Sequence, residues 1–293
     1  MTAVDFAYHR PTSIAEAARV VAEYAPDVAL LAGGGSLGIL LNERAARPSN
    51  VVDLNEVPEL RGIREEDGGV WIGAMTRVYD VEASELLAER IPLLPACART
   101  VADPSLRHRV TVGGGLAYAD PSSSLPTALL ALGGVTVHAA GPRDERAIPI
   151  EELFVASHET SLAQDELITH VTVPVPPTSA GMAWLDLDRR HLSYSLVSAA
   201  AVVETDDGTI RSARVAMAGV APTPRRLPAV ERALQGRSIE PAAVHEAAAV
   251  VAEEADPPSD LHASAAYRRR VAPVIAARAV LDAIGRAGMG GWV

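Results

Sequence analysis

The sequence predicts a mixed α+β fold in two domains, and three observations support this prediction. The chain has 293 residues and 48% hydrophobic content, enough for a sizeable core and more than one domain. Strand-like apolar runs alternate with amphipathic, helix-like stretches. The segment PVPPTSAG at 174–181 interrupts this pattern, because its prolines cannot continue a ladder or a helix. We expect a domain over 1–176, a smaller one over 177–293, and few contacts between them.

The first elements follow from local signals. Ser13 and Glu16 match a capping box, and the apolar residues after them recur at helical spacing. A helix is therefore expected over 14–24. The elements expected next are a buried strand at 28–32, a Gly-rich turn at 33–38, a short helical stretch and a strand at 50–54.

The middle of the chain continues to mix strands and helices. We expect a strand at 69–74, helices around 78–89 and 92–101, and a second Gly-rich turn at 111–115. A helix should run from Ser124 to Leu132 and end at Gly133, where a left-handed cap is easily adopted. A strand at 167–173 completes this part.

The last third predicts a hairpin sheet backed by helices. Asp206, Asp207 and Gly208 form a turn signal between two strand-like runs. Gly236 follows one expected helix, and long Ala/Val-rich stretches at 241–255 and 262–287 predict further helices.

Composition excludes several classes of function. The net charge of −11 argues against a nucleic-acid surface. No apolar run reaches the length of a membrane span, and the N-terminus has no secretory pattern, so a cytoplasmic location is expected. Cys97 is the single cysteine, and we interpret it as a buried structural thiol rather than a reactive one. One thiol cannot hold an iron–sulfur cluster, and the histidines lack metal-ligand spacing, so any metal centre must lie on another chain.

The segment from Gly33 to Gly38 matches the GxGxxG pattern of Rossmann folds, with Asp53 at the end of the next strand. We reject that interpretation, because the stretch between Gly38 and Asn50 is shorter than a parallel crossover usually needs and includes loop-like residues. Consecutive glycines still let a backbone approach a ligand and aim N–H groups at an anion. Two such segments, 33–38 and 111–115, suit the pyrophosphate of FAD, although glycines can also serve tight turns alone.

A family resemblance extends over nearly the whole chain. Its motifs are LLAGGGSLGILL, NVVDLNEVPELRGI, GVWIGAMTRVYDVE, DPSLRHRVTVGGGLAYADPSSSLPTALLAL, RSARVAMAGVAPTPRRLPAVERALQG and AAYRRRVAPVIAARAV. In order and spacing they resemble the FAD-binding medium subunit of the xanthine dehydrogenase and carbon monoxide dehydrogenase family of molybdenum hydroxylases. The resemblance implies a vanillyl-alcohol-oxidase/PCMH-type FAD domain with lobes over about 1–56 and 57–176. A C-terminal domain of the molybdenum hydroxylase flavoprotein type would follow.

The same resemblance implies a set of cofactor-binding residues. Pyrophosphate contacts would come from two segments, namely Ala32, Gly33, Gly34, Gly35 and Ser36, and Thr111, Val112, Gly113, Gly114 and Gly115. Ile168 would pack near the adenine or the flavin. Tyr194 matches an aromatic residue that lies over the isoalloxazine ring, although it could also be a core tyrosine. No motif for covalent flavin attachment is present.

Three positions depart from the family pattern. The family often has Gln or His at Gly35, commonly Asp at Ser124 and usually Lys at Asp186. A carboxylate in place of that lysine should lower the flavin potential or weaken binding, and Arg189 or Arg190 could restore the charge.

The resemblance implies an electron-transfer subunit with FAD on this chain. Its partners would be a large subunit with the molybdenum cofactor and a small subunit with 2Fe–2S clusters, assembled as a dimer of heterotrimers. The electron acceptor, NAD, a quinone or another molecule, stays open. Residues Tyr267 to Arg270 and the helix after them are expected to form a docking surface, with a solvated helix end as the alternative. Two alternatives remain, a flavin-free assembly subunit and a stand-alone flavin oxidase.

Overall fold

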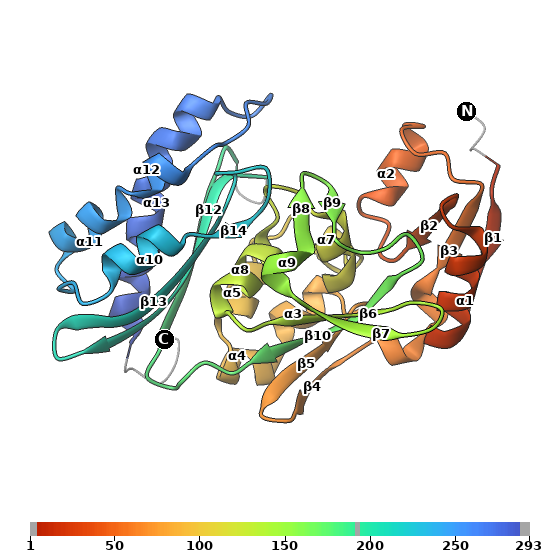
Figure 1. Cartoon of the computed structure of the whole chain (residues 1–293), viewed down its shortest axis with the longest axis horizontal. Helices are drawn as coiled ribbons and strands as arrows, with labels where there is room; N and C mark the ends of the chain where they lie inside the picture. Colours follow the sequence, from red (N-terminus) through yellow and green to blue (C-terminus); the bar gives the residue numbers. More distant parts are fainter. Residues whose placement is uncertain (1–4, 191–193, 288–293) are drawn as a thin grey trace.

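The computed structural model describes residues 5–190 and 194–287. Its three larger β-sheets, which are flanked by helices, follow one another along the long axis of the molecule (Figure 1). They are called the first, second and third sheet in chain order. The mixed helix and sheet content predicted from the sequence is confirmed.

The first sheet lies at the N-terminal end of the molecule. It contains β1 (Ala7–His9), β2 (Val28–Leu31) and β3 (Asn50–Asp53), in the order β1-β3-β2, and β3 pairs in parallel with both neighbours. Helix α1 (Ile14–Tyr24) packs its small apolar face into the local core. Ser13 caps this helix by accepting a hydrogen bond from Glu16 N, whereas the Glu16 carboxylate accepts from Thr12 N. The predicted helix is confirmed, with the capping box displaced by one residue.

The ground for rejecting a parallel crossover between β2 and β3 is wrong. These strands are parallel neighbours, joined by residues 32–49 and the short helix α2 (Leu37–Asn42). The connection is long enough because it begins directly after Leu31, so the glycine loop also contributes to the crossover. Asp53 is not placed for a ribose either, since its carboxylate accepts hydrogen bonds from the Tyr8 hydroxyl and from Asn55.

The second sheet is antiparallel and has the order β4-β5-β10-β6-β7. Its strands are β4 (Ile63–Glu66), β5 (Gly69–Gly73), β10 (Leu167–Pro174), β6 (Thr136–Ala140) and β7 (Glu145–Pro149). The sequence did not predict β4, whose charged residues lie exposed at the sheet edge. The short elements η1 (Leu54–Glu56) and η2 (Pro58–Leu60) lead into this sheet, and α9 (Ile150–Leu153), β8 (Phe154–Ala156) and β9 (Glu159–Thr160) follow β7.

Helices cover one face of the second sheet. They are α3 (Val78–Ala83), α4 (Glu85–Arg90), α5 (Leu93–Ala98), α6 (Pro104–Arg107), α7 (Val112–Tyr118) and α8 (Ser124–Leu132). The single helix expected over 78–89 is wrong, because the chain breaks at Ser84, which caps α4 by accepting from Leu87 N. The helix from Ser124 to Leu132 is confirmed, and Gly133 ends it at φ 69° and ψ 147°, outside the compact left-handed region expected.

The third sheet and its helices form the C-terminal part. The sheet has the order β11-β12-β13-β14, with β11 (Gly181–Asp188), β12 (Ser195–Asp206), β13 (Thr209–Ala218) and β14 (Arg225–Arg226). The hairpin is confirmed, with Asp207 and Gly208 at positive φ in its turn. Helices α10 (Pro228–Leu234), α11 (Pro241–Ala248), α12 (Val251–Glu254) and α13 (Ala265–Arg286) cover its outer face (Figure 1).

The other face of the third sheet packs against α5 and α8, which lie between the second and third sheets (Figure 1). Trp184, Ala200 and Ala216 join the core of the preceding helices. Two hydrogen bonds also cross, from Trp184 Nε1 to Thr100 Oγ1 at 3.0 Å and from Arg214 Nε to the Ala131 carbonyl at 3.2 Å. The expectation of few contacts is wrong because β12 is apolar on both faces and each face must be covered.

Within the docking surface expected at Tyr267 to Arg270, Arg268 does not face solvent. Arg268 is buried, donates to the Leu196 carbonyl and forms an ion pair with Asp260 at 2.6 Å. The apolar side of α13 packs on the third sheet rather than facing solvent. Within the described parts of the chain, no helix has the length and apolar character that a bilayer crossing requires.

Candidate functional site

The two glycine-rich segments lie against each other. A Cβ atom built on Gly33 would lie 1.9 Å from the Arg109 carbonyl oxygen, so the loop after β2 rests directly on the backbone before α7. A Cβ on Gly114 would lie 3.8 Å from the Cβ of Ala32, an ordinary contact. The structure thus brings together segments that are far apart in the sequence, and the absence of side chains permits the approach.

The loop at 33–36 offers unused backbone donors. Among the hydrogen bonds formed by residues 5–190 and 194–287, none uses the N–H of Gly33, Gly34, Gly35 or Ser36. Gly34 has a φ of +71°, which turns the chain in the left-handed region. These residues are half-buried and precede the helix α2. Adjacent free N–H groups of this kind form an anion-binding concavity.

The second glycine segment is not a β-turn or loop. It forms the beginning of helix α7. Thr111 is its N-cap, and its side chain accepts from Gly114 N at 3.1 Å. Val112 N donates to the Thr76 carbonyl, Gly113 N to the Ala74 carbonyl and Gly115 N to the Thr111 carbonyl. The clustered free donors expected at 112–115 are therefore already bonded within the protein.

Each of the three glycines of α7 has different surroundings, so a side chain would have a different effect at each position. A Cβ on Gly113 would lie 2.6 Å from the Cβ of Ala74, so this glycine allows helix and strand end to pack. A Cβ on Gly114 would lie 2.8 Å from Thr111 Oγ1 and would disturb the cap. Gly115 faces open space and is half-exposed. Gly114 thus presents bare backbone beside Ala32, and Gly115 leaves open space next to it, which suits close approach of a ligand.

Asn55 and Arg77 connect the two segments, and neither residue was predicted from the sequence. Asn55 Nδ2 donates to the Ala32 carbonyl at 2.9 Å. Arg77 Nη2 donates to Asn55 Oδ1 at 2.6 Å, and Arg77 Nη1 donates to the Arg109 carbonyl. The sequence offered only a weak signal for Asn55. A polar residue two positions after a strand indicates the edge of a sheet, but it does not show which side chain or carbonyl the residue contacts.

Arg107 fixes the backbone before Thr111, on which the first glycine segment lies. Its buried side chain forms an ion pair with Glu82 at 2.7 Å and donates to the carbonyls of Val101 and Ala102. The 106–111 segment, on which Gly33 rests, is therefore held to α3 and to the end of the preceding loop.

Val110 explains the departure at Gly35. A Cβ on Gly35 would lie 2.5 Å from Val110 Cγ1. The valine side chain occupies the space into which a side chain at position 35 would project. The glycine is thus required by its neighbour in this chain.

The remaining expected site residues have distinct surroundings. Ile168 is buried on β10 within the main core, beside a β-bulge. Ser124 is the first residue of α8 and is half-buried. Tyr194 is 65% exposed, so its interpretation as a core tyrosine is wrong, and its ring lies 6.4 Å from that of His262.

Asp186 lies on the face of β11 that is turned toward α5. Burial raises the pKa of the Cys97 thiol, and the negative charge of Asp186 raises this pKa further. Cys97 is fully buried, which confirms its interpretation as a structural thiol. Arg189 and Arg190 are exposed beyond the end of the strand.

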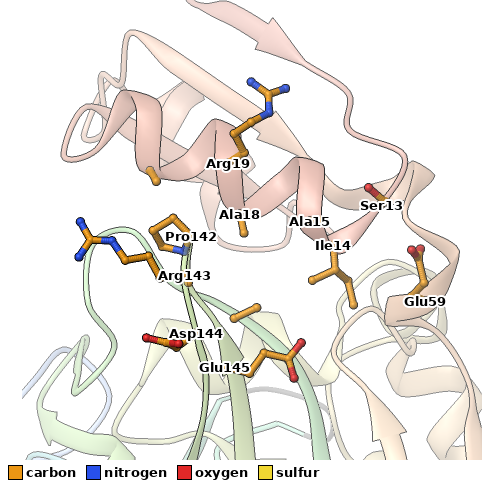
Figure 2. Close-up of a pocket in the computed structure, with 13 residues that line it drawn as sticks. Ser13, Ile14, Ala15, Ala18, Arg19, Glu59, Pro142, Arg143, Asp144 and Glu145 are labelled. Atoms are coloured by element: carbon orange, nitrogen blue, oxygen red, sulfur yellow. The ribbon is translucent and has the colours of Figure 1, made fainter.

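A separate cleft of about 550 Å³ lies between α1 and the tip of the β6–β7 hairpin (Figure 2). Figure 2 shows Arg143, Asp144 and Glu145 on the hairpin side, opposite Ala15, Ala18 and Arg19 of α1. Its lining includes no residue of either glycine segment. Across residues 5–190 and 194–287, no group of three or more His, Cys, Asp or Glu side chains is placed to hold a metal ion.

Comparison with known families agrees with the glycine-segment geometry. Residues 4–176 match the family model described as the FAD binding domain in molybdopterin dehydrogenase. The chain belongs to this flavoprotein family. Residues 183–283 of the flavoprotein match the carbon monoxide dehydrogenase flavoprotein C-terminal domain.

Individual relatives cover nearly the whole flavoprotein. It is 35% identical to the caffeine dehydrogenase subunit beta of Pseudomonas sp. strain CBB1, over 96% of this chain and 95% of that protein. It is 34% identical to the carbon monoxide dehydrogenase medium chain of Hydrogenophaga pseudoflava, over 94% of this chain and 96% of that protein. The flavoprotein is therefore an oxidoreductase subunit.

Solved structures show the same fold. The reconstituted CO dehydrogenase from Oligotropha carboxidovorans superimposes with a TM-score of 0.94 at 34% identity, covering 98% of this chain and 100% of that chain. The quinoline 2-oxidoreductase from Pseudomonas putida 86 gives a TM-score of 0.93 at 31% identity, covering 98% and 99%. The free N–H groups of the 33–36 loop and the bare backbone at Gly114 and Gly115 fit the pyrophosphate of the FAD that this family binds.

Proposed function

We propose that this flavoprotein receives electrons from an iron–sulfur partner and passes them through its FAD to an external acceptor. The observation that carries the proposal is the contact between the two glycine segments, which assembles an anion-binding loop in a chain of this family. When bound, FAD supplies the redox chemistry, because it can exchange electrons both singly and in pairs. The residues of this chain bind and orient the cofactor.

We propose specific roles for the expected site residues. The N–H groups of Gly33, Gly34, Gly35 and Ser36 bind pyrophosphate, with Ala32 fixing the start of the loop. The segment from Thr111 to Gly115 contributes close backbone approach rather than free donors. The exposed ring of Tyr194 is available to cover the isoalloxazine. Roles near the cofactor for Ile168, Ser124 and Asp186 stay predictions.

The partners follow from the cofactors that this chain does not hold by itself. A buried lone thiol cannot hold an iron–sulfur cluster, which supports the proposal that the metal centres lie on other subunits. We propose a small subunit with 2Fe–2S clusters and a large subunit with the molybdenum cofactor, assembled as a dimer of heterotrimers. Relatives whose names specify a medium chain or a complex subunit support a multi-subunit assembly. The cytoplasmic location stays a prediction.

We also propose the division of the chain into an FAD-binding domain over 1–176, with lobes over about 1–56 and 57–176, and a C-terminal domain over 177–293. The ranges matched by the two family models support it. The shared core between β11, β12 and α8 indicates that the domains form one body.

Two measurements test the function. The purified chain should bind FAD without a covalent bond, so acid precipitation should release all flavin into the supernatant. A tagged chain isolated from its host should carry two partner subunits with molybdenum and iron in stoichiometric amounts. A colourless chain that does not bind added FAD would support the flavin-free alternative. Full turnover of an organic substrate by the metal-free chain would support a stand-alone oxidase.

A further inference from the structure

Arg109 brings a positive charge to the glycine loop. Its Nη2 atom lies 3.4 Å from the position that a Cβ of Gly34 would take. The side chain is exposed, and within the described parts of the chain no carboxylate forms an ion pair with it. A guanidinium in this position is free to meet an anion bound at the loop.

The backbone of Arg109 is fixed on both of its polar groups. Its N–H donates to the Leu106 carbonyl at 2.9 Å. Its carbonyl accepts from Arg77 Nη1 and packs against Gly33, where a Cβ would collide with it. The charged side chain therefore extends from a fixed backbone position beside the glycine loop.

The surroundings of Arg109 carry an excess of positive charge. Arg61 donates to the Asn55 carbonyl at 2.5 Å, and Arg77 donates to the Asn55 side chain. Burial lowers the pKa of Arg77, and the charges of Arg61 and Arg109 lower it further, while Asp80 and Asp53 oppose the shift. An anion at the loop would relieve this repulsion between guanidinium groups.

The backbone donors alone bring no full positive charge to a pyrophosphate. The N–H groups of Val112, Gly113, Gly114 and Gly115 are bonded to protein acceptors. The loop from Gly33 to Ser36 supplies neutral donors but no full charge. A cation would strengthen binding of a diphosphate with two negative charges, and Arg109 is an exposed cation beside Gly34.

We propose that Arg109 is the cationic partner of the FAD pyrophosphate, bonding a phosphate oxygen through its guanidinium fork. This inference rests on the proposed function, since it presumes that FAD binds at the loop. The planar fork can donate two parallel hydrogen bonds to one phosphate, which a lysine cannot do.

The test compares full-length apo-proteins. FAD is titrated by quenching of its fluorescence, and ADP, which contains the diphosphate without a flavin, is titrated by calorimetry. Arg109→Gln should weaken both ligands by roughly tenfold to hundredfold, as expected for a charge-assisted hydrogen bond. Arg109→Lys should recover part of the loss. Arg211→Gln, an exposed arginine on the β12–β13 hairpin, is the matched control and should bind like the parent.

Ionic strength provides a readout that a purely structural role would not move. Affinity of the parent for FAD should fall more steeply with added salt than affinity of the Arg109→Gln protein, because one screened charge pair is gone. If the parent binds FAD and Arg109→Gln binds FAD and ADP equally well with the same salt dependence, the inference fails while the proposed function stands. If the parent itself binds no FAD, both fail.

Discussion

The side chain of Val110 occupies the space next to Gly35, with Val110 Cγ1 2.5 Å from the position of a Cβ on that glycine. The family resemblance implies Gln or His at position 35. Gly35→His should therefore clash with Val110 here, lowering the free energy of unfolding by about 1–3 kcal/mol. It should also displace the loop and weaken FAD.

Adding Val110→Gly should restore both properties, because the new side chain then has room. We would measure thermal unfolding and FAD binding for the parent, both single variants and the double variant. The coupling energy between positions 35 and 110 should be about 1–2 kcal/mol. Strictly additive effects would show that Val110 does not control this position.

Gly115 offers a clean steric test of the cofactor site. A Cβ there meets no protein atom within 4 Å, unlike Gly114, whose substitution would disturb the Thr111 cap. Gly115→Val should leave the melting temperature within a few degrees of the parent but weaken FAD at least about tenfold, since bulk would project toward the ligand. Gly285→Val, also helical and facing open space, is the control for intrinsic helix effects. Unchanged FAD affinity in Gly115→Val would remove this residue from the site.

His170 should make stability depend on pH. Burial lowers its pKa to about 4, with the positive charges of His138 and Arg64 as further causes. An unfolded histidine titrates near 6.5, so the unfolded chain binds more protons between about pH 4 and pH 6.5. The free energy of unfolding should therefore be constant above this window for this group and fall as the pH drops through it.

The size of this effect is roughly 1–2 kcal/mol after allowance for solvent screening of a partly exposed ring. His170→Phe keeps an aromatic ring between Trp71 and His138, which stack on it at 5.2 and 4.0 Å, but cannot be protonated. Denaturant unfolding at pH 7.5 and pH 5 should show a smaller stability loss in the variant than in the parent. An equal loss in both proteins would assign the pH dependence to other groups.

Arg268 should be a main determinant of stability in the C-terminal part. It is 3% exposed, forms an ion pair with Asp260 at 2.6 Å and donates to the Leu196 carbonyl. Arg268→Met should lower the free energy of unfolding by about 2–3 kcal/mol, because the Leu196 carbonyl loses a buried donor. The exposed neighbour Arg270, which lies over the Tyr267 ring at 5.4 Å, should tolerate Arg270→Met at a cost under about 1 kcal/mol. Chemical denaturation compares the two, and equal costs would contradict the structural role of Arg268.

Local sequence patterns determined several of the regular elements. The helix from Ser124 to Leu132 and the hairpin turn at Asp207 and Gly208 were predictable, because periodicity, caps and turn residues act over a few neighbouring positions. The glycine segments and the motifs around them also determined the family and the cofactor. Cys97 could be assigned to the core because of its apolar neighbours.

The tertiary structure alone decided how these parts meet. No local pattern shows that Gly33 rests on the carbonyl of Arg109, that Asn55 and Arg77 connect the two segments, or that Thr111 turns the second one into a helix start with bonded N–H groups. Likewise, β12 is apolar on both faces, and only the folded chain shows that one of these faces joins the core of the preceding domain. Each of these outcomes depends on which distant surfaces exclude water together and which buried polar groups find partners, and both are properties of the packed chain rather than of any short stretch of residues.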